Sequence, residues 1–240
     1  MKIQDARELG ERLARLVSDR QVGEACGLLF PLLTERTSFR LLDAIGERVG
    51  IQPSGSLNLF LDQVAAQRTL GGWVVIASAL RRQLSRDLPA AFERCRAYVI
   101  TANVWYATDT FGERVPGAAL VMVFEPALAL LAPWREDPNR WVRRMVGVAV
   151  HFWAKRSHGA VQFLPQARAL LDLLAPLFEE RDTDVIKGVG WGLKTLGKYY
   201  PELAADWLVQ QAGRPHRALI LRKATTYLPA RLQQRFREKL

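Results

Sequence analysis

A helical segment that recurs after 43 residues is the strongest constraint on the fold of this chain. The stretch WVRRMVGVAV at 141–150 aligns with DVIKGVGWGL at 184–193, and apolar, basic and glycine positions coincide in the two copies. Helices that recur at a fixed interval stack on one another, because each copy buries the apolar face of the next. The matched positions are Val142 with Val185, Arg144 with Lys187, Val146 with Val189, Gly147 with Gly190 and Val150 with Leu193.

An interval of 43 residues lies within the range of about 40–47 that is typical of HEAT-type repeats. Apolar residues at steps of three and four predict helices along almost the whole chain, and alternating strand patterns are absent. We therefore expect an all-α fold of HEAT-like helical repeats that form a curved solenoid. The expected single domain spans 1–240, with divergent helices over about 1–95 and clearer repeats over about 96–230. A helical bundle without repeat geometry is the alternative.

The charge balance favours a polyanionic partner. The chain carries 34 basic and 24 acidic side chains, a formal net charge of +10. Residues 1–100 hold 14 of the basic and 11 of the acidic ones, so most of the excess lies after residue 100. An excess of this size is typical of proteins that bind nucleic acid or an anionic surface. We expect the inner face of the solenoid to be a basic groove.

The sequence also predicts the compartment. Cys26 and Cys95 form neither a disulfide framework nor a metal-binding spacing, which favours a reducing environment. The N-terminal segment is charged throughout, unlike a signal peptide, and no apolar run approaches the roughly 18 residues that span a bilayer. We expect a soluble cytoplasmic protein with no membrane partner, which would associate with the nucleoid if its polyanionic partner is DNA.

Candidate site residues lie in two places. In NVWYATDT (103–110), Trp105 and Asp109 are four residues apart, so a helix would place an aromatic ring beside a carboxylate on one face. The next segment, FGERVPG, is expected to be a turn. In the second repeat helix, Trp191 follows Lys187 by one turn and shares its face, and further cations lie near both repeat helices: Arg143, Lys155, Arg156, Lys194 and Lys198.

Four short blocks resemble the AlkD-type DNA glycosylases, a family of HEAT-like-repeat DNA alkylation repair enzymes. They occur in the family's order with similar gaps between about Tyr98 and Tyr227. The blocks are NVWYATDT, NRWVRRMVGVAV, VIKGVGWGLKTLGKYYPELAADWL and RALILRKATTYLP. The resemblance does not reach the first 95 or so residues.

The resemblance implies a role for each matched residue. Trp105 and Trp191 match the tryptophans that flank the deoxyribose of the lesion, and Asp109 matches the catalytic carboxylate. Arg144 matches the arginine that holds a backbone phosphate, and we add Lys187 and Lys194 as further phosphate contacts. One position departs from the family pattern, because Tyr106 stands where an aspartate often follows the first tryptophan.

The implied reaction is hydrolysis of the N-glycosidic bond of cationic N3- or N7-alkylated purines in duplex DNA, the first step of base excision repair. A carboxylate stabilises the oxocarbenium-like sugar that forms when the base departs. The base already carries its positive charge, so little acid catalysis is needed. The implied route holds the sugar against the protein while the lesion base rotates away from it.

Other readings carry different expectations. A relative that binds damaged or branched DNA without cleaving it would keep the basic groove, whereas a scaffold for a protein partner would bind DNA with little dependence on salt. No phosphate-binding glycine motif occurs, and the three histidines share no spacing, so we expect no nucleotide cofactor, no metal and a monomer. The remaining tryptophans are expected to be packing residues: Trp73, Trp134, Trp141, Trp153 and Trp207.

Overall fold

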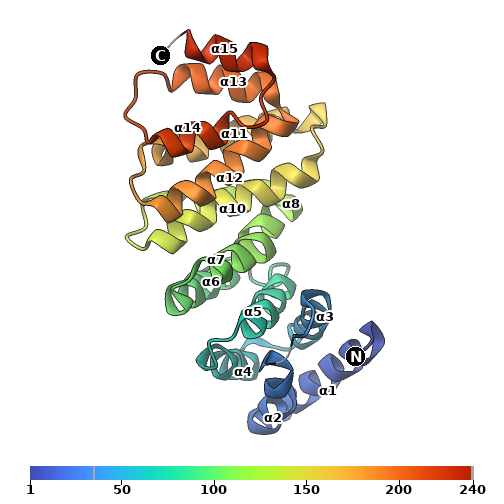
Figure 1. The fold of residues 1–240 in the computed structure, drawn as a ribbon. Coiled ribbons are helices and arrows are strands. Elements are labelled where there is room, and N and C mark those ends of the chain that lie inside the picture. Colours follow the sequence, from blue (N-terminus) through green and yellow to red (C-terminus); the bar gives the residue numbers. More distant parts are fainter. Residues whose placement is uncertain (35, 239–240) are drawn as a thin grey trace. The chain divides into compact units, whose positions relative to one another are not determined.

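A computed structural model describes residues 1–34 and 36–238 of the chain (Figure 1). The described residues form helices joined by short connections, and none of them lies in a strand. The prediction of an all-α helical-repeat fold is therefore confirmed. Contacts within the chain gather into two compact units, an N-terminal unit over Met1–Val115 and a C-terminal unit that begins at Pro116.

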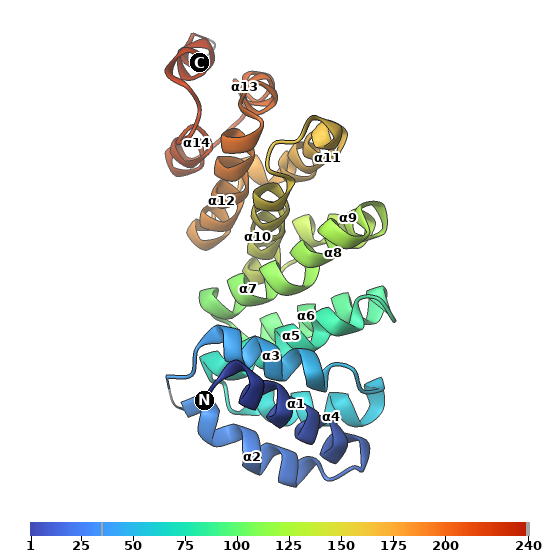
Figure 2. The ribbon, with the colours of Figure 1, turned by 90° about the vertical axis from the view of Figure 1, so that its right-hand side faces the viewer.

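The N-terminal unit consists of two layers of helices (Figure 2). Its odd-numbered helices pack in chain order, α1 on α3, α3 on α5 and α5 on α7, while the even-numbered helices form the other layer. Each pair of helices is therefore one repeat unit that buries its apolar face on the next. The helices are α1 (Ile3–Ser18), α2 (Val22–Thr34), α3 (Phe39–Val49), α4 (Ser54–Ala66), α5 (Leu70–Gln83), α6 (Leu88–Ala102) and α7 (Trp105–Gly112).

The C-terminal unit repeats this plan. Helices α10, α12 and α14 pack in succession in one layer, and α11, α13 and α15 form the other. Short 3₁₀ turns connect several of them. The elements are α8 (Ala118–Met122), α9 (Phe124–Leu131), η2 (Ala132–Glu136), α10 (Arg140–Ser157), η3 (Val161–Phe163), α11 (Leu164–Leu174), η4 (Pro176–Glu179), α12 (Thr183–Tyr199), α13 (Pro201–Gln210), α14 (Ala218–Ala224) and α15 (Ala230–Arg237).

Glycines explain how closely the repeat helices approach one another. A β-carbon on Gly147 of α10 would lie 2.3 Å from the carbonyl oxygen of Gly188 on α12. A β-carbon on Gly190 of α12 would lie 2.5 Å from Cδ of Lys223 on α14. Gly147 and Gly190, which align at an offset of 43 residues, are thus the contact points of two successive helix crossings.

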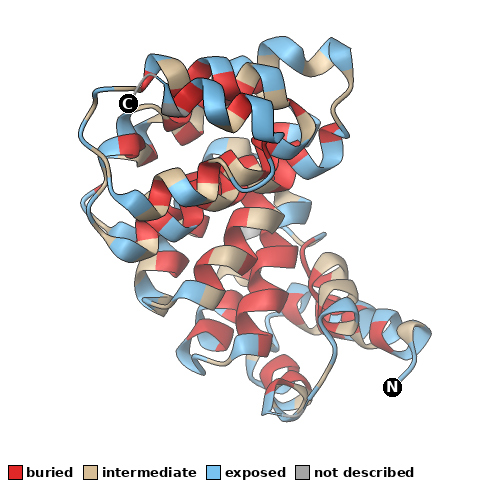
Figure 3. Ribbon diagram, turned by 45° about the horizontal axis from the view of Figure 1, so that its top comes forward, coloured by how far each residue is buried: buried red, intermediate tan, exposed pale blue. Residues whose placement is uncertain are grey.

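The repeats of the N-terminal unit carry no clear sequence signature. Helices α1, α3, α5 and α7 begin at Ile3, Phe39, Leu70 and Trp105, so the spacing varies between 31 and 36 residues. The apolar faces of these helices are buried along the layers, as they are in the C-terminal unit (Figure 3). Packing between layers requires apolar surface of matching shape rather than a fixed set of residues. The structure therefore shows the repeat, whereas the sequence does not.

The turn predicted over FGERVPG is wrong. Helix α7 continues through Gly112 into η1 (Glu113–Gly117), a π-helical turn that contains Pro116. Phe111 and Val115 are fully buried on this segment, and their burial outweighs the breaking tendency of glycine and proline. The wider π turn accommodates Pro116, which has no N–H to donate. The boundary between the two units falls within η1.

Candidate functional site

Helix α7 presents Trp105 and Asp109 on its outer side because its other side is anchored. Phe111 has no exposed surface, and its ring stacks on Tyr98 of α6 at 6.1 Å and meets Trp73 of α5 at 6.2 Å. Trp105 is the first residue of the helix and is 55% exposed, and Asp109 is half-buried one turn later. Trp105 and Asp109 therefore lie one turn apart on the same face of an anchored helix, as their spacing predicts, and their function as a site stays a prediction.

Tyr106 contributes an aromatic contact at the position where the family pattern often has an aspartate. Its ring meets the ring of Trp105 edge to face at 5.7 Å, and its side chain is half-buried. Edge-to-face aromatic pairs stabilise the arrangement by about 0.5–1.5 kcal/mol. Tyr106 thus supports Trp105 by packing, whereas an aspartate at this position would have offered a second carboxylate.

The seven tryptophans fall into two groups by the exposed fraction of their side chains. Trp105 is the most exposed of them and Trp191 is half-buried. The other five are all at most 7% exposed, which confirms that they are packing residues: Trp73, Trp134, Trp141, Trp153 and Trp207. A large aromatic side chain is ordinarily covered in a folded protein, so the two exceptions mark surfaces suited to a ligand.

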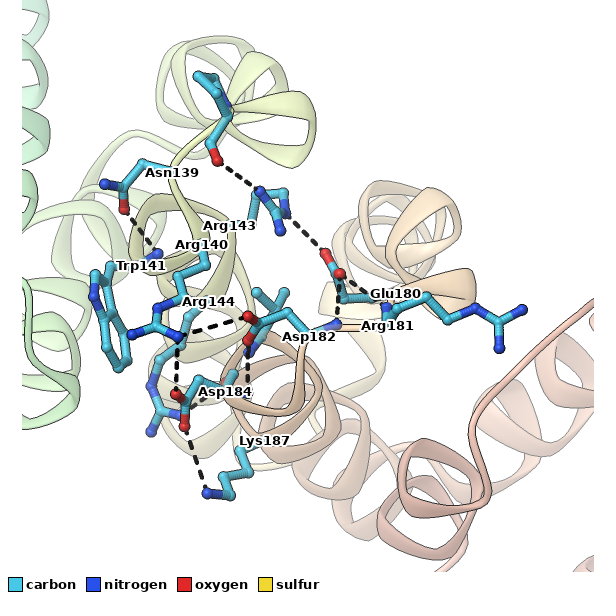
Figure 4. A network of polar contacts seen from close by, with 12 residues as sticks. Asn139, Arg140, Trp141, Arg143, Arg144, Glu180, Arg181, Asp182, Asp184 and Lys187 are labelled. Atoms are coloured by element: carbon cyan, nitrogen blue, oxygen red, sulfur yellow. Dashed lines mark hydrogen bonds and ion pairs between the residues drawn. The ribbon is translucent and has the colours of Figure 1, made fainter.

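In the C-terminal unit, a polar network holds Arg144 and the start of α12 (Figure 4). Arg144 is only 6% exposed, and its Nη1 donates a 2.9 Å hydrogen bond to the backbone oxygen of Asp184. Lys187 is exposed and lies 3.5 Å from a carboxylate oxygen of the same Asp184. The aligned pair Arg144 and Lys187 thus converges on one residue, and the contact of Arg144 with a phosphate stays a prediction.

Side-chain caps fix the start of each repeat helix. Asn139 accepts a 2.9 Å bond from the backbone N–H of Trp141, and Asp182 accepts bonds from those of Asp184 and Val185. Such caps satisfy N–H groups that have no partner within the helix. Both repeat helices therefore begin at a side chain that caps them.

Arg143 is not available as a free cation. Its Nε donates a 2.8 Å bond to Glu180, and its Nη1 donates a 2.8 Å bond to the backbone oxygen of Asp137 (Figure 4). Burial alone would raise the pKa of Glu180, but the bonds from Arg143 and from the backbone hold that pKa below its ordinary value. Arg143 therefore ties together the turns that precede α10 and α12.

A basic stripe runs along the solvent-exposed side of helix α12. Lys187, Trp191, Lys194 and Lys198 follow one another at steps of four, three and four residues, which places them on one side of the helix. The ammonium groups of Lys194 and Lys198 lie 4.6 and 5.7 Å from the ring centre of Tyr227, a half-exposed aromatic residue. Cations interleaved with aromatic surfaces suit a nucleic-acid strand.

The pKa of Lys223 on α14 reflects the positive charge that surrounds this side chain. Its pKa is lowered, first by burial and then by four cations, Lys194, Arg144, Arg222 and Lys187. Like charges that are held together disfavour one another's charged forms. A bound polyanion would reduce this repulsion, so the cations of α10, α12 and α14 are a candidate anion-binding surface of the C-terminal unit.

His151 packs against the candidate site residue Trp191, a contact that the spacing of the histidines did not predict. Its ring stacks on that of Trp191 with 3.8 Å between ring centres and an angle of 21°. Its Nδ1 lies 2.7 Å from Oγ1 of Thr195, which in turn donates to the backbone oxygen of Trp191. His151 and Thr195 therefore hold one face of the Trp191 ring. The one available signal was that His151 follows Gly147 by one turn, on the side of α10 that contacts α12.

Acid is expected to weaken this stack. Burial, with Lys155 and Arg156 nearby, lowers the pKa of His151 to about 4 from an ordinary 6.5. The unfolded chain therefore binds the extra proton between these values, so the stabilising contribution is complete above pH 6.5 and falls as the pH drops toward 4. The full shift corresponds to about 3 kcal/mol, which solvent screening reduces to about 1–2 kcal/mol.

The measurement is the free energy of unfolding at pH 7 and pH 4.5, for the wild type and His151→Gln. The variant should lose about 1–2 kcal/mol less stability on acidification than the wild type. His158→Asn is the control, because His158 is exposed and asparagine tolerates its left-handed backbone conformation (φ 51°). Equal acid sensitivity of the wild type and His151→Gln would contradict this assignment.

Other kinds of site find no support among the described residues. Residues 1–34 and 36–238 contain no cluster of histidine, cysteine or acidic side chains that could hold a metal ion. Both cysteines are buried thiols, and burial raises the pKa of each. No helix in the described part of the chain is long and apolar enough to cross a membrane.

The structure places the predicted site residues in two groups. Trp105 and Asp109 share one face of α7 in the N-terminal unit. Arg144 on α10 lies with Lys187, Trp191 and Lys194 of α12 in the C-terminal unit. Each group thus combines an incompletely buried tryptophan with charged side chains.

Comparison with known proteins agrees with these observations. The sequence profile described as "DNA alkylation repair enzyme" matches residues 73–228, which include both groups of site residues. A search of curated proteins found no match. The profile covers more than half of the chain, so the protein belongs to the family of DNA alkylation repair enzymes, with a role in DNA repair and DNA as its partner.

Proposed function

We propose that this protein is a DNA glycosylase that hydrolyses the N-glycosidic bond of cationic N3- and N7-alkylated purines in duplex DNA. The observation that carries the proposal is the exposed Trp105 ring one turn from Asp109 on the anchored helix α7. Trp105 is held out in solvent although its burial would be favourable, as expected of a surface that a ligand covers.

The proposed reaction breaks the bond between C1′ of the sugar and the purine nitrogen. The electron pair of this bond goes to the alkylated base, which leaves uncharged, and the positive charge moves to the sugar. Asp109 stabilises that charge and orients the water that attacks C1′, whose proton is lost to solvent or to the carboxylate. The products are a free base and an abasic site.

The same chemistry favours charged lesions over neutral ones. A neutral purine needs a proton before it can leave, and the site as proposed contains no group assigned to deliver one. A tryptophan face attracts a cationic sugar by about 0.5–2 kcal/mol. We propose Trp105 and Trp191 for this contact, since they are the two tryptophans that the protein core does not cover.

The C-terminal unit supplies the proposed binding surface for the DNA backbone. The cations that surround Lys223 support this role, as do the Lys187 and Lys194 side chains on the exposed side of α12. Phosphate contacts of this kind position the duplex without reading its sequence.

Salt dependence tests the binding surface separately from the chemistry. A Lys194→Gln/Lys223→Gln protein should bind unmodified duplex DNA with a slope of log K against log salt that is smaller by about 2, because each lost phosphate contact removes about 0.9. Arg168→Gln combined with Arg231→Gln removes two charges from exposed positions on α11 and α15, in the other helix layer of the C-terminal unit, and serves as the control. Equal slopes for all three proteins would contradict the proposed surface.

The test of the function is release of base from duplex DNA that contains 7-methylguanine. We expect the wild type to release 7-methylguanine and to leave unmodified guanine in place. Tight, salt-sensitive binding without release would instead make the protein a DNA-binding relative that does not cleave. Binding that is insensitive to salt would favour a protein-interaction scaffold.

A further inference from the structure

An arginine-lined groove lies on the N-terminal unit, in the layer that α7 also belongs to. It has a volume of about 520 Å³ and follows α3, with α1 on one side and α5 on the other. One face of α3 lines it from end to end with residues 40, 43, 44, 47 and 48. The arginines of the groove are Arg7 from α1, Arg40 and Arg48 from α3, and Arg82 from α5.

The two acidic residues in the groove are already engaged by cations from outside it. Asp43 accepts bonds of 2.7 and 3.1 Å from Arg114 and a 2.6 Å bond from Ser78. Glu47 lies 3.8 Å from Arg81, which does not line the groove. These acids therefore do not neutralise the arginines of the groove.

The arginines themselves are largely uncompensated. Arg48 makes one long contact of 3.7 Å with Glu11, and both side chains are well exposed. Arg7, Arg40 and Arg82 are exposed and take part in no ion pair within residues 1–34 and 36–238. Within the described part of the chain, the groove therefore carries several positive charges without an acidic partner.

The spacing of these charges suits a strand better than a single anion. Arg40 and Arg48 are eight residues apart on one helix, which corresponds to about 12 Å. A DNA strand advances about 3.4 Å per nucleotide, so this distance covers about three to four phosphates. Guanidinium groups bind phosphate oxygens in pairs, and here they point from three different helices into one groove.

We propose that this groove binds successive backbone phosphates of duplex DNA. The choice of DNA as the polyanion rests on the proposed function, whereas the groove and its charge do not. Arg7, Arg40 and Arg48 lie outside the residues 73–228 that match the family profile. The divergent N-terminal helices thus give this chain a DNA contact of its own.

The experiment uses the full chain and an unmodified duplex of about 20 base pairs. The Arg7→Gln/Arg82→Gln protein is compared with Arg15→Gln/Arg36→Gln, which loses the same charge from exposed positions outside the groove. Fluorescence anisotropy gives the affinity between about 50 and 200 mM salt. All four side chains are exposed, so neither pair is expected to disturb folding.

The groove variant should show a slope of log K against log salt that is smaller by about 2, with affinity about 10- to 100-fold weaker at the low-salt end. The control pair should change affinity by no more than about two- to threefold. Equal effects of both pairs, or no effect of either, would overturn the proposal. Weakened binding of single-stranded RNA with unchanged binding of the duplex would also overturn it.

Base release separates this proposal from the proposed function. Base release by the wild type, with protein in excess over DNA that contains 7-methylguanine, tests the glycosylase independently of the groove, because Asp109 and Trp105 do not line the groove. A wild type that releases no base would refute the glycosylase and leave the binding comparison valid. A groove variant that binds like the wild type would refute the groove, whatever the result for base release.

Discussion

The Asp109→Asn protein is expected to release 7-methylguanine from duplex DNA about 100- to 1,000-fold more slowly than the wild type. The substitution keeps the shape of the side chain and removes the negative charge that, in the proposed mechanism, stabilises the developing positive charge on the sugar. Loss of one preorganised electrostatic partner in an active site typically costs this much in rate. Single-turnover base release, with protein in excess over DNA, measures the effect on the chemical step.

Binding of unmodified duplex should not weaken in this variant. Removing a negative charge from a DNA-binding surface reduces repulsion, so affinity should stay equal or rise slightly. Asp172→Asn is the matched control, because Asp172 is exposed on α11 and lies in the other unit. Full base release by Asp109→Asn would remove Asp109 from the mechanism, and an equal loss in Asp172→Asn would point to a general effect of charge.

Gly147→Ala is expected to destabilise the C-terminal unit by about 3 kcal/mol. The new β-carbon would lie within 2.4 Å of three backbone atoms of α12, which belong to Gly188 and Val189. Backbone atoms inside a packed helix pair cannot rotate away, so α10 and α12 would have to move apart and lose contacts. A loss of this size corresponds to about 6–12 °C in melting temperature for a chain of this length.

Gly27→Ala makes the same chemical change with the opposite expected sign. Gly27 lies on an exposed part of α2, and a β-carbon there would meet nothing within 4 Å. Alanine is favoured over glycine in a helix by about 0.5–1 kcal/mol, so this variant should be slightly more stable. Equal stability of Gly147→Ala and the wild type would show that the two helices do not depend on the close approach.

These variants also test how the site is held. Gly147 lies one turn before His151, whose ring covers a face of Trp191. A wider gap between α10 and α12 would therefore loosen Trp191 along with the core. We expect Gly147→Ala to lower both stability and base release, whereas Asp109→Asn should lower base release alone.

Local spacing made part of the candidate site predictable. Trp105 and Asp109 share a face because they are one helical turn apart, and Lys187, Trp191 and Lys194 share a face for the same reason. The repeat alignment also identified Gly147 and Gly190 as equivalent positions, and both proved to be contact points between helices. Which residues share a face of one helix depends only on the helical period.

Relations between helices were not predictable in the same way. The sequence does not indicate that Arg143 forms an ion pair with Glu180. Nor does it indicate that His151 stacks on Trp191, which lies 40 residues further along the chain. The burial of Phe111 and Val115 likewise carried α7 onward through a segment whose glycine and proline suggested a turn. Each outcome depends on which helix faces are brought into contact.

The sequence by itself determined the helical class, the repeat of the C-terminal unit, the family and the residues that match its motifs. Those features follow from periodicity and from short patterns, which are properties of neighbouring residues. Only the tertiary structure decided which cations are already paired, that the His151 ring covers Trp191, and that arginines from α1, α3 and α5 share one groove. These are properties of packing, and packing joins residues that are distant in the chain.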